Sequence, residues 1–537
     1  MLLLYATLFI SGGAILALEL LASRIMTPYF GVSLYIWTGI LSITLVALAL
    51  GYWLGGRLAA TRDFGQRGAP QLFKLYALMP TVAAAGIVAA CFVYPHAFAP
   101  LAASSLVFGS FAAGLVLLFI PLVAASAMNP LLVAIALRRG GAGQAADAGA
   151  GTVFFVSTVG SVAGVLVTAF GLIPYLSNFA STLAVALVLA LLTLGLTVFS
   201  REPLPAKPLI GTGAVGVCVV ALALLWNADA HTARNGPFTY AGIQWRLEGR
   251  YTSLFGTVKV LRTVGEPDSG RFLRMYFQDG LTQNTVDSDH RSTSFYTYGL
   301  EALARAYRPQ MRSALVLGLG AGMVPMALAK TGVEVEVVDV DPVAPRVAHV
   351  HFGFDPARVR THVADARTFV RGCDKTYDVV VVDLFHGDGT PDHLVTREFF
   401  RDLRKCLGSG GIAVFNTFAD VTRPRAYAHF LVTLKAELPN LAVYRPEGHG
   451  THVNSFVVAS GAPLPPPAPV TLSYVPPRHS STLWTMLSAP LPLGAEHFEG
   501  GRIVTDTANP AAYDFARMQM VYRRSVVESA PRGLLVN

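Results

Sequence analysis

The chain has 537 residues, of which 53% are hydrophobic and only 14% are charged, and its mean hydropathy is +0.50. So much apolar sequence excludes a protein that is soluble throughout. The formal net charge of +8 is modest for this length, and the basic residues are scattered or lie in short connections, which excludes a nucleic-acid-binding stripe.

The apolar excess lies in the first 227 residues and predicts a transmembrane helical bundle over residues 1–230. The first segment lacks a basic start and runs directly into a second, which argues against a cleaved signal peptide. The fourth contains Pro121 and Pro130, so we expect one kinked helix or a helix followed by a broken one. Seven segments are long enough to cross about 30 Å of hydrocarbon as helices. They are 3–27, 34–58, 73–94, 103–137, 151–173, 179–199 and 208–227.

Two pairs of small residues inside these segments favour close helix packing. Gly51 and Gly55, and likewise Gly160 and Gly164, are four residues apart, so that a neighbouring helix can approach the backbone. In a chain with 50 glycines, chance spacing is the alternative.

Lysine and arginine alternate between the connections, and the positive-inside rule places the basic connections in the cytoplasm. If the first basic connection follows one crossing, the N-terminus starts outside and seven crossings leave everything after Trp226 inside. An extra crossing within 103–137 would invert the downstream part. The cytosolic origin of the nucleoside ligand inferred below favours the simple count, so we expect a multi-pass membrane protein with a cytoplasmic catalytic domain. The basic residues are Arg57, Arg62, Arg67, Lys74, Arg138, Arg139, Arg201 and Lys207.

The second half of the chain has strand-like runs and turn signals. We expect a small antiparallel β subdomain over 236–290 and an α/β domain over 291–460, followed by a proline-rich linker and C-terminal tail over 461–537. Continuous apolar runs such as YDVVVVD are typical of parallel strands that are buried on both faces, which predicts a doubly wound, Rossmann-like sheet. The predicted parallel strands are 313–318, 334–339, 360–364, 377–383 and 411–417, and a strand over 453–460 would add an antiparallel edge.

Residues 313–341 contain the most informative pattern, SALVLGLGAGMVPMALAKTGVEVEVVDVD. It predicts a strand, a glycine turn, a helix and a second strand that ends in acid, the first half of a nucleotide-binding βαβ unit. Gly318, Gly320 and Gly322 would let the backbone turn tightly and approach a ligand. Asp339 lies where a carboxylate can bind two ribose hydroxyls.

Acidic residues also follow the next two strands. Ligands of an open α/β sheet bind at the carboxyl ends of its strands, where Asp339, Asp365 and Asp383 are expected. Each acid taken singly could be a helix N-cap. Three acids and a glycine turn at four successive strand ends favour a ligand site.

These motifs resemble the spermidine synthase family of aminopropyltransferases, and more closely its membrane-bound relatives, described as fused transporter and spermidine synthase proteins. The resemblance in the first half rests on LLLYATLFISGGAILALELLASRIMTPYFG, LALGYWLGGRLA and FFVSTVGSVAGVLVTAFGLIP. In the second half it covers residues 250–420 through QDGLTQ, VLGLGAGM, VVDVDP, VADAR and YDVVVVDLFHGDGTPDHLVTREFF.

The resemblance implies a role for each matching residue. Asp339 would bind the ribose of a sulfonium nucleoside donor, and Asp365 with Ala366 would bind its adenine. Gln283 would line the donor pocket. Asp383 would be the catalytic base, because an amine attacks only when deprotonated and a carboxylate can bind the ammonium and remove its proton.

The sequence also departs from the family pattern. The acid that holds the donor's aminopropyl ammonium in soluble members is replaced by Ala321, so both decarboxylated S-adenosylmethionine and intact S-adenosylmethionine remain as donors. His386 occupies the place of a second, polyamine-binding acid, for which Asp388 could substitute. The further acceptor-site candidates are Tyr296, Tyr298 and Asp279, of which Asp279 is also a good turn residue.

Three functions therefore stand beside one another. The first is a membrane-anchored aminopropyltransferase of polyamine biosynthesis, and the second is a methyl or aminocarboxypropyl transferase that acts on a membrane acceptor. The third is a non-catalytic nucleoside or polyamine sensor, against which Asp383 argues. We expect a small amine acceptor, the lipid bilayer as the surroundings, no nucleic acid and no metal, because the four cysteines lack metal-ligand spacing. The sequence leaves the oligomeric state open, with a homodimer as one alternative.

Overall fold

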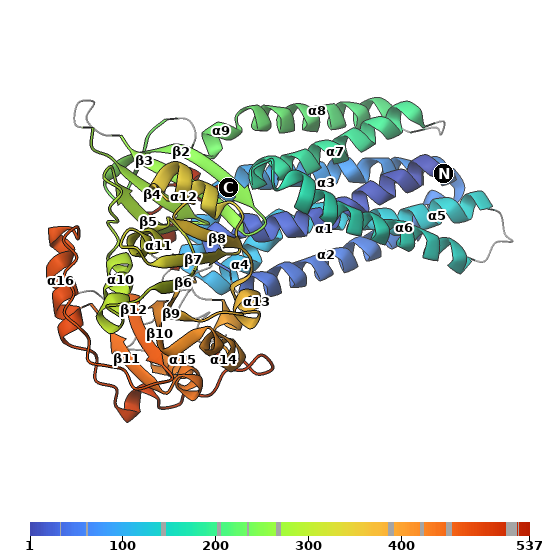
Figure 1. Cartoon of the computed structure of the whole chain (residues 1–537). Coiled ribbons are helices and arrows are strands. Elements are labelled where there is room, and N and C mark those ends of the chain that lie inside the picture. Colours follow the sequence, from blue (N-terminus) through green and yellow to red (C-terminus); the bar gives the residue numbers. More distant parts are fainter. Residues whose placement is uncertain are drawn as a thin grey trace. The chain divides into compact units, whose positions relative to one another are not determined.

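The computed structural model divides the chain into two compact units, Met1–Ala241 with Arg524–Asn537, and Gly242–Arg523 (Figure 1). It describes all residues except 33, 61–62, 141–145, 201–203, 205, 234–235, 265–269, 385–390, 419–423, 447–453, 512–522 and 525.

The first unit is a helical bundle. Within the described residues, seven helices are long and apolar enough to cross a membrane, as the sequence predicts. The helices of this unit are α1 (Leu2–Phe30), α2 (Leu34–Ala60), α3 (Asp63–Ser104), α4 (Leu106–Gly114), α5 (Ile120–Gly140), α6 (Ala146–Val167), α7 (Asn178–Phe199), α8 (Lys207–Trp226), α9 (Ala228–His231) and α18 (Arg532–Leu535).

The fourth predicted segment is one helical span. A π-helical turn at Leu115–Phe119 joins α4 to α5, so the chain stays helical across Pro121. The proline has no N–H to donate, and a π turn in the preceding residues is a common way to accommodate an altered hydrogen-bond ladder. Residues 106–138 therefore make one crossing by length and composition.

The glycine pairs lie where helices touch. A Cβ added at Gly164 would meet the carbonyl oxygen of Gly13 at 2.2 Å, and one at Gly160 would meet that of Phe9 at 2.0 Å, so α6 packs backbone to backbone against α1. Gly51 has the same role on α2, where an added Cβ would come within 2.5 Å of the Val123 carbonyl oxygen of α5. Chance spacing is thus not the explanation of these glycines.

The assumption of one crossing before the first basic connection is wrong. Arg57 lies at the end of α2, and Lys74 lies in the first part of α3, so the basic connection follows two apolar helices. The expected cytoplasmic location of the second unit rested on that assumption and on the cytosolic supply of the nucleoside ligand.

The second unit begins with an antiparallel sheet in the order β2-β3-β4-β5. Its alternating buried residues form a small core with α12 that includes Val258, Val260, Tyr276 and Phe352. The strands are β2 (Ile243–Ser253), β3 (Gly256–Thr263), β4 (Leu273–Gln278) and β5 (Leu281–Asp287), and β1 (Phe238–Tyr240) precedes them in the chain.

A larger mixed sheet follows, with the order β11-β12-β10-β9-β6-β7-β8 among the described residues. Pairing is parallel from β10 to β8 and antiparallel for β12 and β11. The chain starts this sheet in its middle, at β6, and then builds outward on both sides, which confirms the predicted Rossmann-like class. Its strands are β6 (Ser313–Leu317), β7 (Glu334–Asp339), β8 (Val359–Val363), β9 (Tyr377–Val382), β10 (Leu407–Phe418), β11 (Asn440–Tyr444) and β12 (Asn454–Ser460).

Helices cover both faces of this sheet (Figure 1). Two buried clusters form its core, one on each face, because parallel strands such as β9 direct alternate valines to opposite sides. The helices are α10 (Phe295–Tyr307), α11 (Met323–Ala329), α12 (Ala344–Phe352), α13 (Ala366–Arg371), α14 (Arg397–Lys405), α15 (Pro424–Glu437) and α16 (Pro477–Ser488).

Two features differ from the expectation for the end of the chain. The strand expected at an edge, β12, lies between β10 and β11. The edge strand is β11, which was not predicted from the sequence. The stretch 461–469 is not a spacer, since the N–H of Ala468 donates to the carbonyl of Ala306 and Leu464 packs on the core. Leu483 and Met486 of α16 are buried in the same core.

We predict that Gly164→Val destabilises the full-length protein, because its side chain cannot fit between α6 and the backbone of α1. Gly195→Val in α7 is the matched control, since a Cβ there would meet nothing within 4 Å in the described structure. Thermal unfolding in detergent should show a drop of several degrees for Gly164→Val alone, consistent with about 1–3 kcal/mol for overpacking. Equal melting temperatures for the two variants would contradict the packing described above.

Candidate active site

A cavity of about 730 Å³ lies in the second unit at the carboxyl ends of β6, β7, β8, β9 and β10. It falls at the point where the order of the parallel strands reverses, between β6 and β9. The antiparallel sheet contributes to the same cavity through residues such as Tyr276 and Gln283.

The glycine turn between β6 and α11 forms one wall. Gly318, Gly320 and Gly322 have φ angles of 96°, 50° and 78°, in the left-handed region where glycine is favoured. Gly318 is also fixed by contact, because an added Cβ would meet the carbonyl oxygen of Asp383 at 2.1 Å. The turn therefore brings β6 against the end of β9.

Asp339 ends β7 beside this turn. Its Oδ2 accepts the N–H of Leu319 at 2.9 Å, and its Oδ1 accepts the N–H of Asp341 at 2.8 Å. Burial raises the pKa of Asp339, and the two backbone N–H groups oppose that shift. The carboxylate thus braces the glycine turn, and its remaining lone pairs can accept hydroxyl groups from the cavity.

Asp365 and Ala366 follow β8. The Oδ1 of Asp365 caps α13 by accepting the N–H and the hydroxyl of Thr368 at 2.8 and 2.9 Å. The N-cap interpretation is therefore correct for this acid, but both residues also line the cavity. The second carboxylate oxygen, Oδ2, lies 3.9 Å from Nε2 of His393.

Asp383 lies at the end of β9 and faces the cavity. Its Oδ1 accepts the side-chain amide of Asn416 at 2.8 Å, and the Oδ1 of Asn416 accepts the amide of Asn454 at 2.8 Å. Burial raises the pKa of Asp383 to about 6, and donation from Asn416 opposes the rise. A carboxylate with such a pKa is ionised at neutral pH and still basic enough to take a proton.

Tyr296 and Gln283 form the wall contributed by α10 and β5. The Tyr296 hydroxyl donates to the backbone carbonyl of Gln283 and accepts from Asn284, both at 3.3 Å. Burial and the nearby charge of Asp383 raise the pKa of Tyr296 well above its usual value, so it stays a neutral hydrogen-bonding group.

Two predicted acceptor-site residues do not line the cavity. Tyr298 lies two residues beyond Tyr296, on the opposite side of α10, and its hydroxyl donates to the carbonyl of Ser292 at 2.7 Å within the core. Asp279 occupies the β4–β5 turn at φ 45°, where its Oδ1 accepts the N–H of Thr257. This contact shapes the hairpin, and Asp279 is not among the residues that line the cavity.

The other two predicted acceptor-site residues, His386 and Asp388, lie outside the described residues. Their place in the site stays a prediction.

Several polar residues of the cavity were not predicted from the sequence, among them Asn416, Asn454 and His479. Asn416 could have been found, because it lies near the carboxyl end of the predicted strand 411–417, and the rule of inspecting strand ends applies to it as well. Asn454 enters through the antiparallel β12, and His479 through α16. No local pattern pointed to either.

The cavity is acidic. Four aspartates line it, and none of its described lining residues is a lysine or arginine. Asp341 supplements the three acids predicted from the strand ends. Such a cavity favours a ligand with positive charge, since low-dielectric surroundings strengthen its attraction to the carboxylates.

Ala321, the departure in the glycine turn, does not line the cavity. It is buried against Val258, Val260 and Tyr276, in the small core under the antiparallel sheet.

Comparison with known proteins places this site in a family context. Residues 294–436 match the spermine/spermidine synthase domain. A polyamine aminopropyltransferase of Vibrio vulnificus is 37% identical over 119 residues, which are 21% of this chain and 40% of that protein. One from Moorella thermoacetica is 28% identical over 184 residues, 33% of this chain and 64% of that protein.

The chain is also similar to a methyltransferase and to a solved spermidine synthase. An N-terminal histidine N-methyltransferase of Emericella nidulans is 33% identical over 138 residues, 25% of this chain and 24% of that protein. A solved spermidine synthase in complex with the transition state analogue AdoDATO is 18% identical, with a TM-score of 0.37, and the match covers 47% of this chain and 91% of that one. The chain spans less than two thirds of the length of each of these three curated relatives.

The match to residues 294–436 agrees with the spermine/spermidine synthase domain expected from the motifs. The helical bundle precedes this domain in the chain.

Proposed function

We propose that this chain, through its spermine/spermidine synthase domain, is a membrane-anchored aminopropyltransferase. Its donor is decarboxylated S-adenosylmethionine, and its acceptor is a small amine. The acidic cavity at the carboxyl ends of the parallel strands is the single observation that carries the proposal.

The charge of the cavity matches the charges of these substrates. The decarboxylated donor carries a sulfonium and an ammonium, and the acceptor enters as an ammonium, so all three groups are cationic. Asp339, Asp341, Asp365 and Asp383 supply the opposite charge. Intact S-adenosylmethionine would add a carboxylate, for which the described lining offers no lysine or arginine.

The residues of the glycine turn and of the strand ends bind different parts of the donor. Asp339, braced by the N–H groups of Leu319 and Asp341, binds the ribose hydroxyls. Asp365 and Ala366 bind the adenine, and the side chain of Gln283 lines the donor pocket. Gly318 and Gly320 keep the backbone close to the ligand because they carry no Cβ.

Asp383 is the catalytic base. It accepts a proton from the acceptor ammonium, and the amine nitrogen then attacks the carbon next to the sulfonium sulfur. The new C–N bond forms as the C–S bond breaks, and the electron pair stays on sulfur in methylthioadenosine. This leaving group needs no acid, so alignment of the two substrates contributes much of the remaining acceleration.

Asn416 positions the base. Its amide donates to one oxygen of Asp383, which leaves the other oxygen for the acceptor amine, and Asn454 fixes the orientation of Asn416. Tyr296 lies close enough for the Asp383 charge to raise its pKa, and it contributes to the acceptor side of the cavity. By the family resemblance, His386 and Asp388, which are outside the described residues, would also bind the acceptor.

A second candidate function has its own support. By the family resemblance, Ala321 stands where soluble members carry the acid that holds the aminopropyl ammonium, although its side chain does not line the cavity here. One similar protein is a histidine N-methyltransferase. On this alternative, intact S-adenosylmethionine donates a methyl or aminocarboxypropyl group to a membrane acceptor. Asp383 argues against a third alternative, a non-catalytic sensor, because a sensor needs no base.

The two transferase functions differ in their products. Purified full-length protein is incubated with each donor, a panel of amines and a lipid extract, and the nucleoside product is identified by mass spectrometry. We expect methylthioadenosine from the decarboxylated donor with a polyamine acceptor. Adenosylhomocysteine would establish methyl transfer instead. Methylthioadenosine that forms only from the intact donor would establish aminocarboxypropyl transfer, and neither product with any acceptor would support the sensor.

We predict that Asp383→Asn abolishes turnover, because the amide cannot accept the ammonium proton. The variant keeps the shape of the side chain, so calorimetry should show nearly unchanged binding of methylthioadenosine. Its melting temperature should not fall, since burial disfavours the charged form of Asp383. Retained activity would show that the base is misassigned.

The pH dependence tests the same residue. Because the base works only when deprotonated, kcat/KM should rise about tenfold per pH unit below pH 6 and level off above it. Asn416→Ala removes a hydrogen bond that lowers the pKa of Asp383, so we predict that this rise moves about one unit toward higher pH. Asn440→Ala in β11 is the control, because its amide donates only to Ser460 and Gly461 in the described structure. An unchanged profile for Asn416→Ala would refute its positioning role.

A further inference from the structure

The helical bundle has a basic end. The Tyr76 hydroxyl of α3 donates to the carbonyl of Leu4 at 2.7 Å, and the Thr193 hydroxyl of α7 donates to the carbonyl of Ala77 at 3.0 Å. The start of α1, the start of α3 and the last turns of α7 therefore lie together. The contacts of Gly51 and Gly55 advance in the same direction along α2 and α5, so the two helices are parallel. The end of α5 therefore lies beside the end of α2.

The basic connections of the bundle lie at this end. Arg57 ends α2, Lys74 follows in α3, Arg138 ends α5, and Lys207 begins α8. In the sequence, Arg62, Arg67, Arg139 and Arg201 belong to the same three connections.

The opposite end of the bundle is where the chain leaves for the second unit. His231, just beyond α8, stacks on Phe179 at the start of α7, with ring centroids 5.2 Å apart. Phe179 also packs on Tyr94 near the end of α3. The start of the second unit is thus connected to the bundle end that lies away from Arg57, Lys74 and Lys207.

The chain returns to the same end after the second unit. The N–H of Phe179 donates to the carbonyl of Asn537 at 2.9 Å, and Arg532 pairs with His96 of α3 at 2.9 Å. Figure 1 marks the two termini at opposite ends of the bundle. Residues 242–523 are therefore inserted between two chain segments that both lie at the end opposite the basic one. This conclusion does not depend on counting crossings.

The helix connections 31–35 (GVSLY) and 173–177 (IPYLS) at this opposite end carry no lysine or arginine, whereas the chain segments that lead to and from the second unit contain Arg234, Arg524 and Arg532. Arg24 lies nearby within α1, where its Nε donates to Asn178. By the positive-inside rule, the basic end is cytoplasmic and the opposite end is not.

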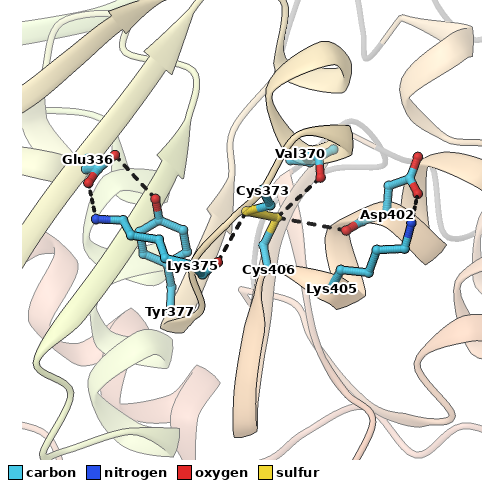
Figure 2. The surroundings of a disulfide bond; sticks show 8 residues. All are labelled: Glu336, Val370, Cys373, Lys375, Tyr377, Asp402, Lys405 and Cys406. Atoms are coloured by element: carbon cyan, nitrogen blue, oxygen red, sulfur yellow. Dashed lines mark hydrogen bonds and ion pairs between the residues drawn. A yellow bond between two sulfur atoms is a disulfide. The ribbon is translucent and has the colours of Figure 1, made fainter.

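A disulfide in the second unit agrees with that orientation. Cys373, just beyond α13, is bonded to Cys406, just beyond α14 (Figure 2). Their Cα atoms are 5.7 Å apart. Cys406 is fully buried, and its Sγ lies 3.6 Å from the carbonyl oxygen of Val370 in α13. Disulfides form and persist in oxidising compartments and are rare in the cytosol.

We propose that the domain of residues 242–523 lies on the extracytoplasmic side of the membrane, where Cys373 and Cys406 are oxidised. This orientation reverses the one expected from the sequence. Each thiol gives up one hydrogen as the S–S bond forms, and the two electrons and two protons pass to a thiol–disulfide oxidoreductase of that compartment. The cavity then takes its amine acceptor from that side, and a donor made in the cytosol must be supplied across the membrane.

Cysteine labelling in intact bacterial cells tests the orientation. Ser481→Cys places a thiol on exposed α16, and Ala60→Cys places one at the exposed end of α2, without changing any basic residue. The parent protein gives the background, because its free cysteines Cys91 and Cys218 are buried. We expect a membrane-impermeant maleimide to label Ser481→Cys before permeabilisation and Ala60→Cys only afterwards. Labelling of Ala60→Cys in intact cells, or of Ser481→Cys only in permeabilised ones, would overturn the proposal.

The state of the cysteine pair gives a second readout. Cells are quenched in acid, and the denatured protein is alkylated with and without prior reduction. We expect Cys373 and Cys406 to be modified only after reduction, and modification without a reductant would also overturn the proposal. Neither measurement uses enzymatic activity, so failure of the orientation is distinguishable from failure of the proposed transferase function.

Discussion

The close approach of two neighbouring strand ends organises the candidate active site. Gly318 follows β6 and contacts the backbone of Asp383 so closely that no side chain could be placed between them. Since β6 and β9 are adjacent and parallel, this contact sets the floor of the cavity where the strand order reverses. The glycine turn, braced by Asp339 from β7, then faces Asp383, and the separation of the turn from this carboxylate depends on that one packing constraint.

The acidic lining of the cavity determines which ligands it favours, namely cationic ones. Carboxylates that are removed from water are unfavourable when charged, and the raised pKa values of Asp339 and Asp383 express that cost. A cationic ligand offsets the cost, so the proposed sulfonium and ammonium groups would both be held and would keep the acids ionised. The pKa of about 6 for Asp383 leaves it charged at neutral pH and able to accept a proton, with Asn416 stabilising the charged form.

The bundle adds a directional constraint. Backbone contact through Gly160 and Gly164 aligns α6 with α1, and similar contacts align α5 with α2, so the basic residues gather at one end. The second unit departs from and returns to the other end, through His231 and Asn537. The charge distribution is a property of the bundle, and the Cys373–Cys406 disulfide is a property of the second unit. These two independent observations both favour the extracytoplasmic side for the second unit.

The sequence by itself determined what depends on local pattern. Apolar length predicted the seven helices, and valine-rich runs with glycine and aspartate at their ends predicted the strands and Asp339, Asp365 and Asp383, because strand ends converge in any parallel sheet. It could not decide which face of α10 meets the cavity, so Tyr296 and Tyr298 were treated alike although only Tyr296 lines it. Asn454 and His479 reach the site, and Cys373 reaches Cys406, through packing between distant segments. Only the tertiary structure could reveal those contacts, because they depend on long-range strand order and helix orientation that no short stretch of sequence encodes.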